Sequence, residues 1–246
     1  MVNSGDLIRR FLIERKKFDR SGIYGYTQRF FAYNSNRIEG SALSEEQVSF
    51  LLDTGMLPAS SGPYRARDIE EACGHFLTFL KMIDTLDRPL SAALIKALHY
   101  ELRVGVFDDR VRGYAIGGYR ARPSRTGEYG VTPPEDVALG MDKLLRWYHG
   151  VLEKDLAVLA EFHARFMGVF PFQGGNGQIG RLVLFRECLV NGMVPLIVEA
   201  TDRGDYLAGL KEHRERGNIE RLLELFKLEQ ARYSEAVRFF LSECGE

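Results

Sequence analysis

The residues best suited to chemistry lie in one glycine-rich stretch, Pro171 to Gly177, and just after it. Three of the four residues from 174 to 177 are glycine, so several backbone N–H groups can turn toward one point. A helix is predicted from Gln178 to Val190, and its positive dipole end adds to the attraction for an anion. Arg181, one turn into that helix, supplies a cation. The pattern indicates an anion-binding loop, although a helix-to-helix turn that merely needs glycine has the same spacing.

A second candidate segment, Gly105 to Val131, alternates glycine with tyrosine and arginine, and has no acidic residue from 110 to 127. Tyr114 and Tyr119 lie between the arginines, a combination that suits stacking or phosphate contacts, including those of a nucleic acid. We interpret the segment as a loop or short β-hairpin that contacts a ligand or partner. A solvated loop whose arginines pair with acids elsewhere is the alternative. The arginines are Arg110, Arg112, Arg120, Arg122 and Arg125.

The other reactive side chains indicate neither a metal site nor a nucleophile. His163 lies in a predicted helix, which favours a hydrogen-bonded core role over catalysis. The remaining histidines have no spacing typical of a zinc site, and the cysteines are widely spaced. The pattern Gly-x-x-x-x-Gly-Lys-Ser/Thr is absent, which excludes a P-loop. These histidines are His75, His99, His149 and His213, and the cysteines are Cys73, Cys188 and Cys244.

Composition narrows the class of protein. The chain has 246 residues, 33 Lys and Arg against 34 Asp and Glu, and 45% hydrophobic residues, which is typical of an ordered globule. The net charge of -1 argues against a protein that coats nucleic acid. No apolar run approaches the roughly 18 to 20 residues of a membrane span, and the first residues are charged throughout. We therefore expect a cytoplasmic protein.

Helical periodicity dominates the chain. Ser44 and Gln47 form a capping-box pattern, and Ser91 is predicted to cap another helix. From Ala66 onward, one buried helix face is predicted from the spacing of Ile69, Cys73, Phe76, Leu77 and Leu80. Further helices are predicted after Pro133 and from about Leu152 to Met167, and the helical pattern continues through the C-terminal hundred residues. The chain is therefore predicted to be all-α.

The glycine-rich loop with its flanking helices resembles the signature motif of Fic proteins, of the Fido superfamily. That motif reads His-Pro-Phe-x-Asp/Glu-Gly-Asn-Gly-Arg-x-x-Arg and lies between two helices of an all-α core. The matching positions here are Pro171, Phe172, Gly175, Asn176, Gly177 and Arg181. The resemblance implies a Fic-type helical core, and a family chemistry that typically transfers AMP from ATP to a protein hydroxyl.

Two further segments are similar to parts of Fic proteins. The residues from Ser35 to Gly40 resemble the Ser/Thr-x-x-x-Glu-Gly motif of the family's inhibitory helix. Residues 117–131 look like the target-docking flap, for which a short β-hairpin is expected, with Arg120, Arg122 and Arg125 as contacts to a partner or substrate. We expect an N-terminal helical segment, residues 1–90, that carries the inhibitory-type motif. A Fic core, residues 91–246 with its motif loop at 170–181, would complete one compact unit.

The departures from the motif bear directly on catalysis. Phe170 stands at the position of the family's general-base histidine, Gly174 at that of the Mg²⁺-binding acid, and Gln178 at that of the first, phosphate-contacting arginine. Phenylalanine cannot accept a proton, and a positioned base is worth about 10² to 10⁴ in rate. Losing the metal ligand and a phosphate contact weakens transition-state stabilisation as well. No catalytic residue is therefore assigned, and neither a metal site nor bound Mg²⁺ is expected.

A selective set of residues remains for binding ATP or another phosphate-bearing ligand: Gly175, Asn176, Gly177, Arg181 and Tyr206. Tyr206 with Leu210 matches a Tyr-x-x-x-Leu pattern near the family's adenine pocket, although simple core packing has the same spacing. Ser35 and Glu39 are candidate regulatory residues, because the family's inhibitory Glu pairs with the second motif arginine. A Glu39–Arg181 pair kept for folding alone is the alternative.

Three functional hypotheses follow. The first is a Fic-fold protein diverged from protein AMP transfer that retains an anion or nucleotide pocket, with the family chemistry lost or repurposed. The second is a residual protein adenylyltransferase. The third is a non-catalytic pseudoenzyme that docks a partner protein through its flap. The expected partners are a small phosphorylated or anionic ligand and a protein target; neither a membrane nor a nucleic acid is expected.

Overall fold

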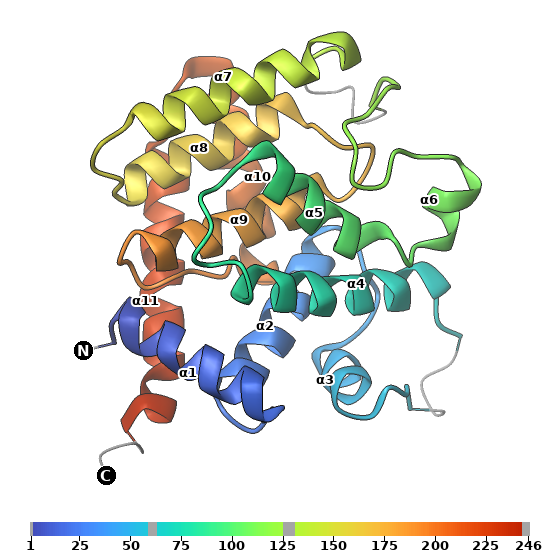
Figure 1. Cartoon of the computed structure of the whole chain (residues 1–246), viewed down its shortest axis with the longest axis vertical. Helices are drawn as coiled ribbons and strands as arrows, with labels where there is room; N and C mark the ends of the chain where they lie inside the picture. Colours follow the sequence, from blue (N-terminus) through green and yellow to red (C-terminus); the bar gives the residue numbers. More distant parts are fainter. Residues whose placement is uncertain (1, 59–62, 125–130, 243–246) are drawn as a thin grey trace.

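The computed structural model describes residues 2–58, 63–124 and 131–242, and its helices surround one central helix, α9 (Figure 1). The α-helices are α1 (Ser4–Lys17), α2 (Ile23–Ile38), α3 (Glu45–Thr54), α4 (Ala66–Ile83), α5 (Ala92–Arg103), α6 (Phe107–Val111), α7 (Val137–Gly150), α8 (Leu156–Val169), α9 (Asn176–Val190), α10 (Arg203–Arg216) and α11 (Glu220–Ser242). Short 3₁₀ turns, η2 (Pro134–Asp136) and η3 (Ala200–Asp202), precede α7 and α10. The described ranges contain no strand, so the expected all-α class is confirmed. Within them, no helix is both long and apolar enough to cross a membrane.

Helix α9 is buried along nearly its whole length, which places the glycine-rich loop at its start inside the molecule. Every residue from Asn176 to Leu189 is buried. In Figure 1, α8 lies above α9, and α2 and α4 lie below it. The Phe185 ring packs 6.4 Å from Phe11 of α1 and 5.2 Å from Phe31 of α2, measured between ring centroids. The helices of the first ninety residues therefore share one core with the rest of the chain.

Local capping chemistry sets several helix ends. The Ser44 hydroxyl accepts from the Gln47 N–H at 3.2 Å and the Gln47 side chain accepts from the Ser44 N–H at 2.9 Å, so the predicted capping box is confirmed. Ser91 caps α5 by accepting from the Leu94 N–H at 3.2 Å. Helix α9 begins at Asn176, two residues before the predicted start, because Gly175 adopts the left-handed conformation that turns the chain into the helix.

The buried face predicted for α4 is wrong at two of its five positions. Cys73 is exposed, and the Leu77 side chain is 49% exposed, whereas Phe76 is buried and Ile69 and Leu80 are partly buried. Beside Phe76, the buried face contains Ala72, His75, Phe79, Met82 and Ile83. A Cβ atom at Gly74 would lie 2.1 Å from the Leu102 carbonyl oxygen of α5, so only glycine permits this contact between the helices. Close backbone approach, rather than the run of large apolar residues, selects the face of α4 that is buried.

The expected β-hairpin flap is not present in the described part of the segment. Residues 107–111 form α6, and residues 117–124 form no strand, while 125–130, with Arg125, lie outside the described residues. Backbone groups at the two ends of the segment bond to the last turn of α8 and to the connection that follows it. The Arg120 N–H donates to the Pro171 carbonyl at 2.9 Å, and the Thr132 N–H donates to the Gly168 carbonyl at 3.3 Å. These backbone groups therefore bond to the motif loop region instead of to each other.

Candidate anion-binding site

The glycine-rich loop joins α8 to α9 and passes twice through the left-handed region, at Phe170 (φ 51°) and at Gly175 (φ 76°). The Asn176 side chain stabilises the loop through two hydrogen bonds to the Phe172 backbone. Its side-chain oxygen accepts from the Phe172 N–H and its amide donates to the Phe172 carbonyl, both at 2.8 Å. The first helical hydrogen bond of α9 runs from the Ile179 N–H to the Gly175 carbonyl. The N–H groups just before Ile179 therefore lie outside the helical ladder and form the positive end of α9.

Arg181 lies one turn after this loop and is 2% exposed. Its guanidinium donates to the Ser35 carbonyl at 2.9 Å, to the Ser35 hydroxyl at 3.1 Å and to the Glu39 carboxylate at 2.9 Å. It also donates to the Tyr206 hydroxyl at 3.5 Å, and that hydroxyl lies 2.8 Å from Nε2 of His163. Burial, aided by the Arg181 charge, lowers the pKa of His163 to about 3, so this imidazole is neutral. One arginine thus connects α2, α9 and α10, and through Tyr206 it reaches α8.

Glu39, at the C-terminal end of α2, lies against the positive end of α9. A Cβ atom at Gly177 would come within 2.1 Å of the Glu39 carboxylate, so only glycine permits this approach. The Glu39 side chain remains 37% exposed. A carboxylate of the chain itself therefore occupies the place where the loop and Arg181 would attract an anion.

Two cavities flank Glu39. The first, of about 320 Å³, is lined by loop residues 173–178 and by charged side chains of α4 and α5. The second, of about 380 Å³, is lined mostly by apolar side chains from Ile38, Val131, Met167, Leu207 and Leu210, together with Tyr206. Glu39, Met167 and Phe170 line both cavities. These three residues therefore form the partition between a polar and a largely apolar space.

His99 holds the loop from outside the motif. Its Nδ1 accepts from the Gly117 N–H at 3.0 Å, so Nε2 carries the proton and donates to the Gly174 carbonyl at 3.1 Å. The ring stacks on Phe172 with 3.8 Å between centroids. Burial lowers the pKa of His99 to about 3, which keeps the imidazole neutral. The sequence does not predict this role, because no motif near His99 indicates it.

Arg120, expected to contact a partner or substrate, is 3% exposed and bonds within the chain. Its guanidinium donates to the Phe170 carbonyl at 2.7 Å, to the Arg122 carbonyl at 3.3 Å and to the Thr132 carbonyl. These bonds hold the left-handed turn at Phe170. Arg122 is exposed and donates to the Arg112 carbonyl at 3.1 Å. Beside it, a surface hollow of about 360 Å³ is lined by Arg112, Tyr114, Arg122, Pro123 and Gln173.

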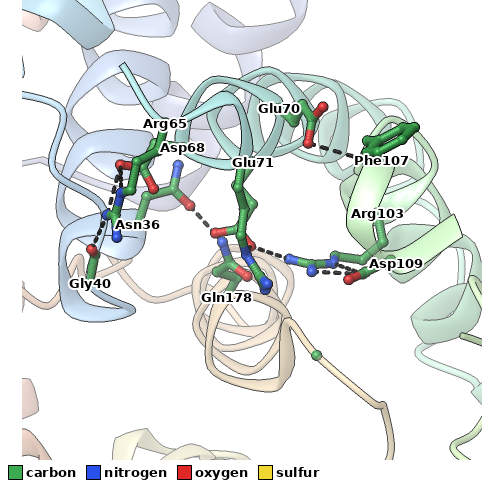
Figure 2. A network of polar contacts seen from close by, with 12 residues as sticks. Asn36, Gly40, Arg65, Asp68, Glu70, Glu71, Arg103, Phe107, Asp109 and Gln178 are labelled. Carbon is green, nitrogen blue, oxygen red and sulfur yellow. Dashed lines mark hydrogen bonds and ion pairs between the residues drawn. The ribbon is translucent and has the colours of Figure 1, made fainter. Parts of the chain in front are cut away.

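Gln178, at the position of the first motif arginine, makes a bond that ties α9 to α2. Its amide donates to the Asn36 side-chain oxygen at 2.6 Å (Figure 2). Both side chains are about 1% exposed. The neutral amide therefore fixes the inhibitory-type motif beside the loop, and it brings no positive charge to the first cavity.

The family motif implies a Mg²⁺ ion, but the residues around position 174 do not fit one. A Cβ atom there would lie 3.3 Å from Nη2 of Arg103, so a guanidinium stands beside the place of the missing acid. Arg103 is 1% exposed and is held by Glu71 at 2.6 Å and by Asp109 at 2.7 Å, on either side of it in Figure 2. In the part of the chain that the structure describes, no three His, Cys, Asp or Glu side chains are grouped to hold a metal.

Among the described residues, no histidine and no unpaired carboxylate lines either cavity. Asp68 and Glu71 line the first cavity, but Asp68 lies 2.8 Å from Arg65 and Glu71 is bound to Arg103. Glu39 is bound to Arg181. The arrangement is thus suited to holding an anion rather than to taking a proton from a hydroxyl.

Part of the chain matches a known protein family. Residues 89–187 match the model of the Fic/DOC family. The protein adenylyltransferases fic-1 of Caenorhabditis briggsae and Caenorhabditis elegans are each 28% identical to this chain over 196 residues. Each alignment covers 73% of this chain and 35% of the relative, so the chain spans about a third of the length of these relatives.

Solved structures share the fold. A Fic domain containing signaling protein from Bacteroides thetaiotaomicron has a TM-score of 0.73 at 22% identity, covering 96% of this chain and 95% of that protein. A fragment of Fic-1 from Caenorhabditis elegans has a TM-score of 0.72 at 22% identity, covering 96% of this chain and 73% of the fragment. Residues 89–187 therefore form a Fic/DOC family domain, and the chain shares the fold of solved Fic structures.

Proposed function

We propose that this chain is a Fic-fold protein diverged from protein AMP transfer, which retains a pocket for a nucleotide or other phosphate-bearing ligand and closes it with its own Glu39. The position of the Glu39 carboxylate carries the proposal, since it lies at the positive end of α9 and 2.9 Å from Nη2 of Arg181. A carboxylate and a phosphate both accept from N–H groups and a guanidinium, so one can replace the other. The curated relatives are protein adenylyltransferases, which makes ATP the first ligand to test.

The two cavities support a ligand with one charged and one apolar part. The polar cavity beside Gly175 to Gly177 suits phosphates, and the largely apolar cavity beside Tyr206 suits a base. Such a ligand would span the partition, so Glu39 must move aside for it to bind. Because Glu39 is 37% exposed, its carboxylate can turn into water while Ser35 still holds Arg181. In this proposal Ser35 and Glu39 are regulatory residues.

The proposal includes loss or repurposing of AMP transfer. Phe170 lines both cavities at the position of the family's base, and its ring cannot take a proton from a target hydroxyl. With ATP bound, the missing base alone lowers the expected rate of transfer by about 10² to 10⁴.

Melting curves with and without ATP test the proposal. A ligand at 100 times its Kd adds about 2.7 kcal/mol to the free energy of unfolding. We expect ATP to raise the melting temperature of Glu39→Gly more than that of the wild type, because the competing carboxylate is gone. The gain should disappear in Glu39→Gly/Arg181→Ala. Glu153→Gly, which removes an exposed loop carboxylate, serves as the control and should behave as wild type. Absence of any ATP effect in Glu39→Gly would refute the proposal.

A second function, docking of a protein partner through the flap, is favoured by the hollow beside Arg122. Arg112 and Arg122 are exposed there, and Tyr114, Pro123 and Gln173 complete the lining. This chemistry suits an acidic segment of a partner. Partner binding of this kind should survive Arg181→Ala and be lost in Arg112→Ser/Arg122→Ser, as measured by pull-down. The opposite pattern would assign the binding to the loop.

A further inference from the structure

Gly174, at the position of the motif's metal-binding acid, lies beside the buried side chain of Arg103. We propose that the pocket binds its phosphate ligand without a divalent metal ion, with Arg103 standing where the family motif would hold Mg²⁺. This inference rests on the proposed function, in which the pocket holds a phosphate-bearing ligand. It adds that the bound species is the free anion rather than its magnesium complex.

The geometry around Gly174 places Arg103 against the loop. Measured from an ideal Cβ at residue 174, Nη2 of Arg103 lies at 3.3 Å, Cζ at 3.7 Å and Nε at 4.0 Å. The Cδ atom of Arg103 lies 3.3 Å from the corresponding point at Gly175. The side chain therefore runs along two successive loop residues. A carboxylate on residue 174 would meet the guanidinium and be neutralised by it, so it would not be free to bind a metal.

Arg103 cannot readily leave this position. Glu71 and Asp109 hold it from two sides, and all three side chains are at least nine-tenths buried. In Figure 2, the same end of α4 also binds the N-terminus of α6, where the Phe107 N–H donates to Glu70 at 3.2 Å. The guanidinium is thus a fixed part of the fold, and it occupies the space beside residue 174 that a metal ion and its ligands would need.

The carboxylates that line the polar cavity are all committed to arginines. Glu71 binds both Arg103 and Arg67, Asp68 binds Arg65, and Glu39 binds Arg181. No acidic group of the described lining is left over to attract a metal. Hard divalent cations prefer oxygen ligands with uncompensated charge.

The donors of the same cavity favour a free phosphate. They comprise the N–H groups at the start of α9 and the guanidinium groups of Arg65, Arg67 and Arg103, with Arg181 behind the loop. Gln178 brings no charge, and Arg103 of α5 is the cation that lies beside the loop at Gly174 and Gly175. A phosphate at the start of α9 would accept from these N–H groups and lie beside the paired guanidinium groups, which are hydrogen-bond donors that require no bound metal.

Calorimetric titration of Glu39→Gly with ATP, in excess EDTA and in excess MgCl₂, tests the inference. We expect the Kd in MgCl₂ to be no more than about threefold lower than the Kd in EDTA. A Kd at least about tenfold lower in MgCl₂ would overturn the inference alone. No binding in either buffer would overturn the proposed function, and the inference with it.

A second variant tests the role of Arg103 without disturbing its buried partners. Gly174 has a backbone conformation open to other residues, so Gly174→Asp and Gly174→Asn can be compared in the Glu39→Gly background. We expect the new carboxylate to pair with Arg103, so that Mg²⁺ still tightens ATP binding by less than about threefold in both. Tightening of about tenfold or more in Gly174→Asp but not in Gly174→Asn would show that the acid is free to hold a metal, and would overturn the inference.

Discussion

Two arginines are buried beside the same loop, but their charges are balanced in different ways. Arg103 is held by Glu71 and Asp109, whose side chains are 9% and 5% exposed. Arg181 has one carboxylate partner, Glu39, which is 37% exposed. The first arrangement is a fixed brace between helices. The second leaves a cation whose partner can move into water, so the regulatory role that we propose is on the side of Arg181, and Arg103 contributes rigidity.

The largest effect on stability is expected from the removal of Arg103. Arg103→Gln leaves two buried carboxylates without their cation, which should lower the free energy of unfolding by about 3 to 5 kcal/mol. Arg146→Gln removes an arginine that is 68% exposed and paired with Asp142, and should cost about 0 to 1 kcal/mol. Urea denaturation measures both. A loss below about 1 kcal/mol in Arg103→Gln would contradict the view of Arg103 as a brace.

Removing the second arginine should cost less. Arg181→Gln loses charged hydrogen bonds to Ser35, worth about 1.5 to 3 kcal/mol, while Glu39 gains water. In the Glu39→Gly background the same change should abolish ATP binding in a titration. A stability loss as large as that of Arg103→Gln would indicate that the Glu39–Arg181 pair serves folding rather than control.

The pH dependence of stability tests the surroundings of Arg181. Burial first, and the Arg181 charge second, lower the pKa of His163 from 6.5 to about 3. Between these values the unfolded chain binds a proton that the folded chain does not, so stability should fall as the pH drops from about 6.5 toward 3. One such proton contributes about 1.4 kcal/mol per pH unit. Denaturation from pH 7 to 5 should therefore give a shallower slope for His163→Gln than for wild type, and an unchanged slope would contradict a neutral buried His163.

The smallest effect on stability is expected at Glu39. Glu39→Gln removes a carboxylate that is 37% exposed but leaves Ser35 and an amide oxygen to accept from the buried Arg181, so it should cost about 1 to 2 kcal/mol. Glu71→Gln, which removes a buried partner of Arg103, should cost about 3 kcal/mol or more. Melting the two variants side by side checks the contrast. Equal losses would mean that the two arginines are held in the same way.

The fold was predictable where local chemistry decides it. The Ser44 capping box and the Ser91 cap follow from residue type and spacing, and the structure contains both. The buried face of α4 was only partly predictable, because the contact of Gly74 with the Leu102 carbonyl is a property of two packed helices. The hairpin expectation failed for a similar reason, since the Arg120 N–H bonds to Pro171, fifty-one residues away in the chain.

The site was predictable only where the motif itself carries the information. The contact between Glu39 and Arg181 was expected from the resemblance, and it is present at 2.9 Å. Arg103 and His99 were missed, although they contact or bond to the same loop. Asp109 lies six residues after Arg103 and Glu71 thirty-two before it, so only the packing of α4, α5 and α6 brings the brace together.

The central claim is that Glu39 occupies the place of a ligand phosphate, and a crystal structure of Glu39→Gly with ATP in the presence of EDTA tests it most directly. We predict a phosphate group against the first turn of α9, near Gly177, within hydrogen-bond distance of Arg181, and the nucleoside toward Tyr206. ATP bound elsewhere on the protein, with the start of α9 and Arg181 making no contact to it, would contradict the account.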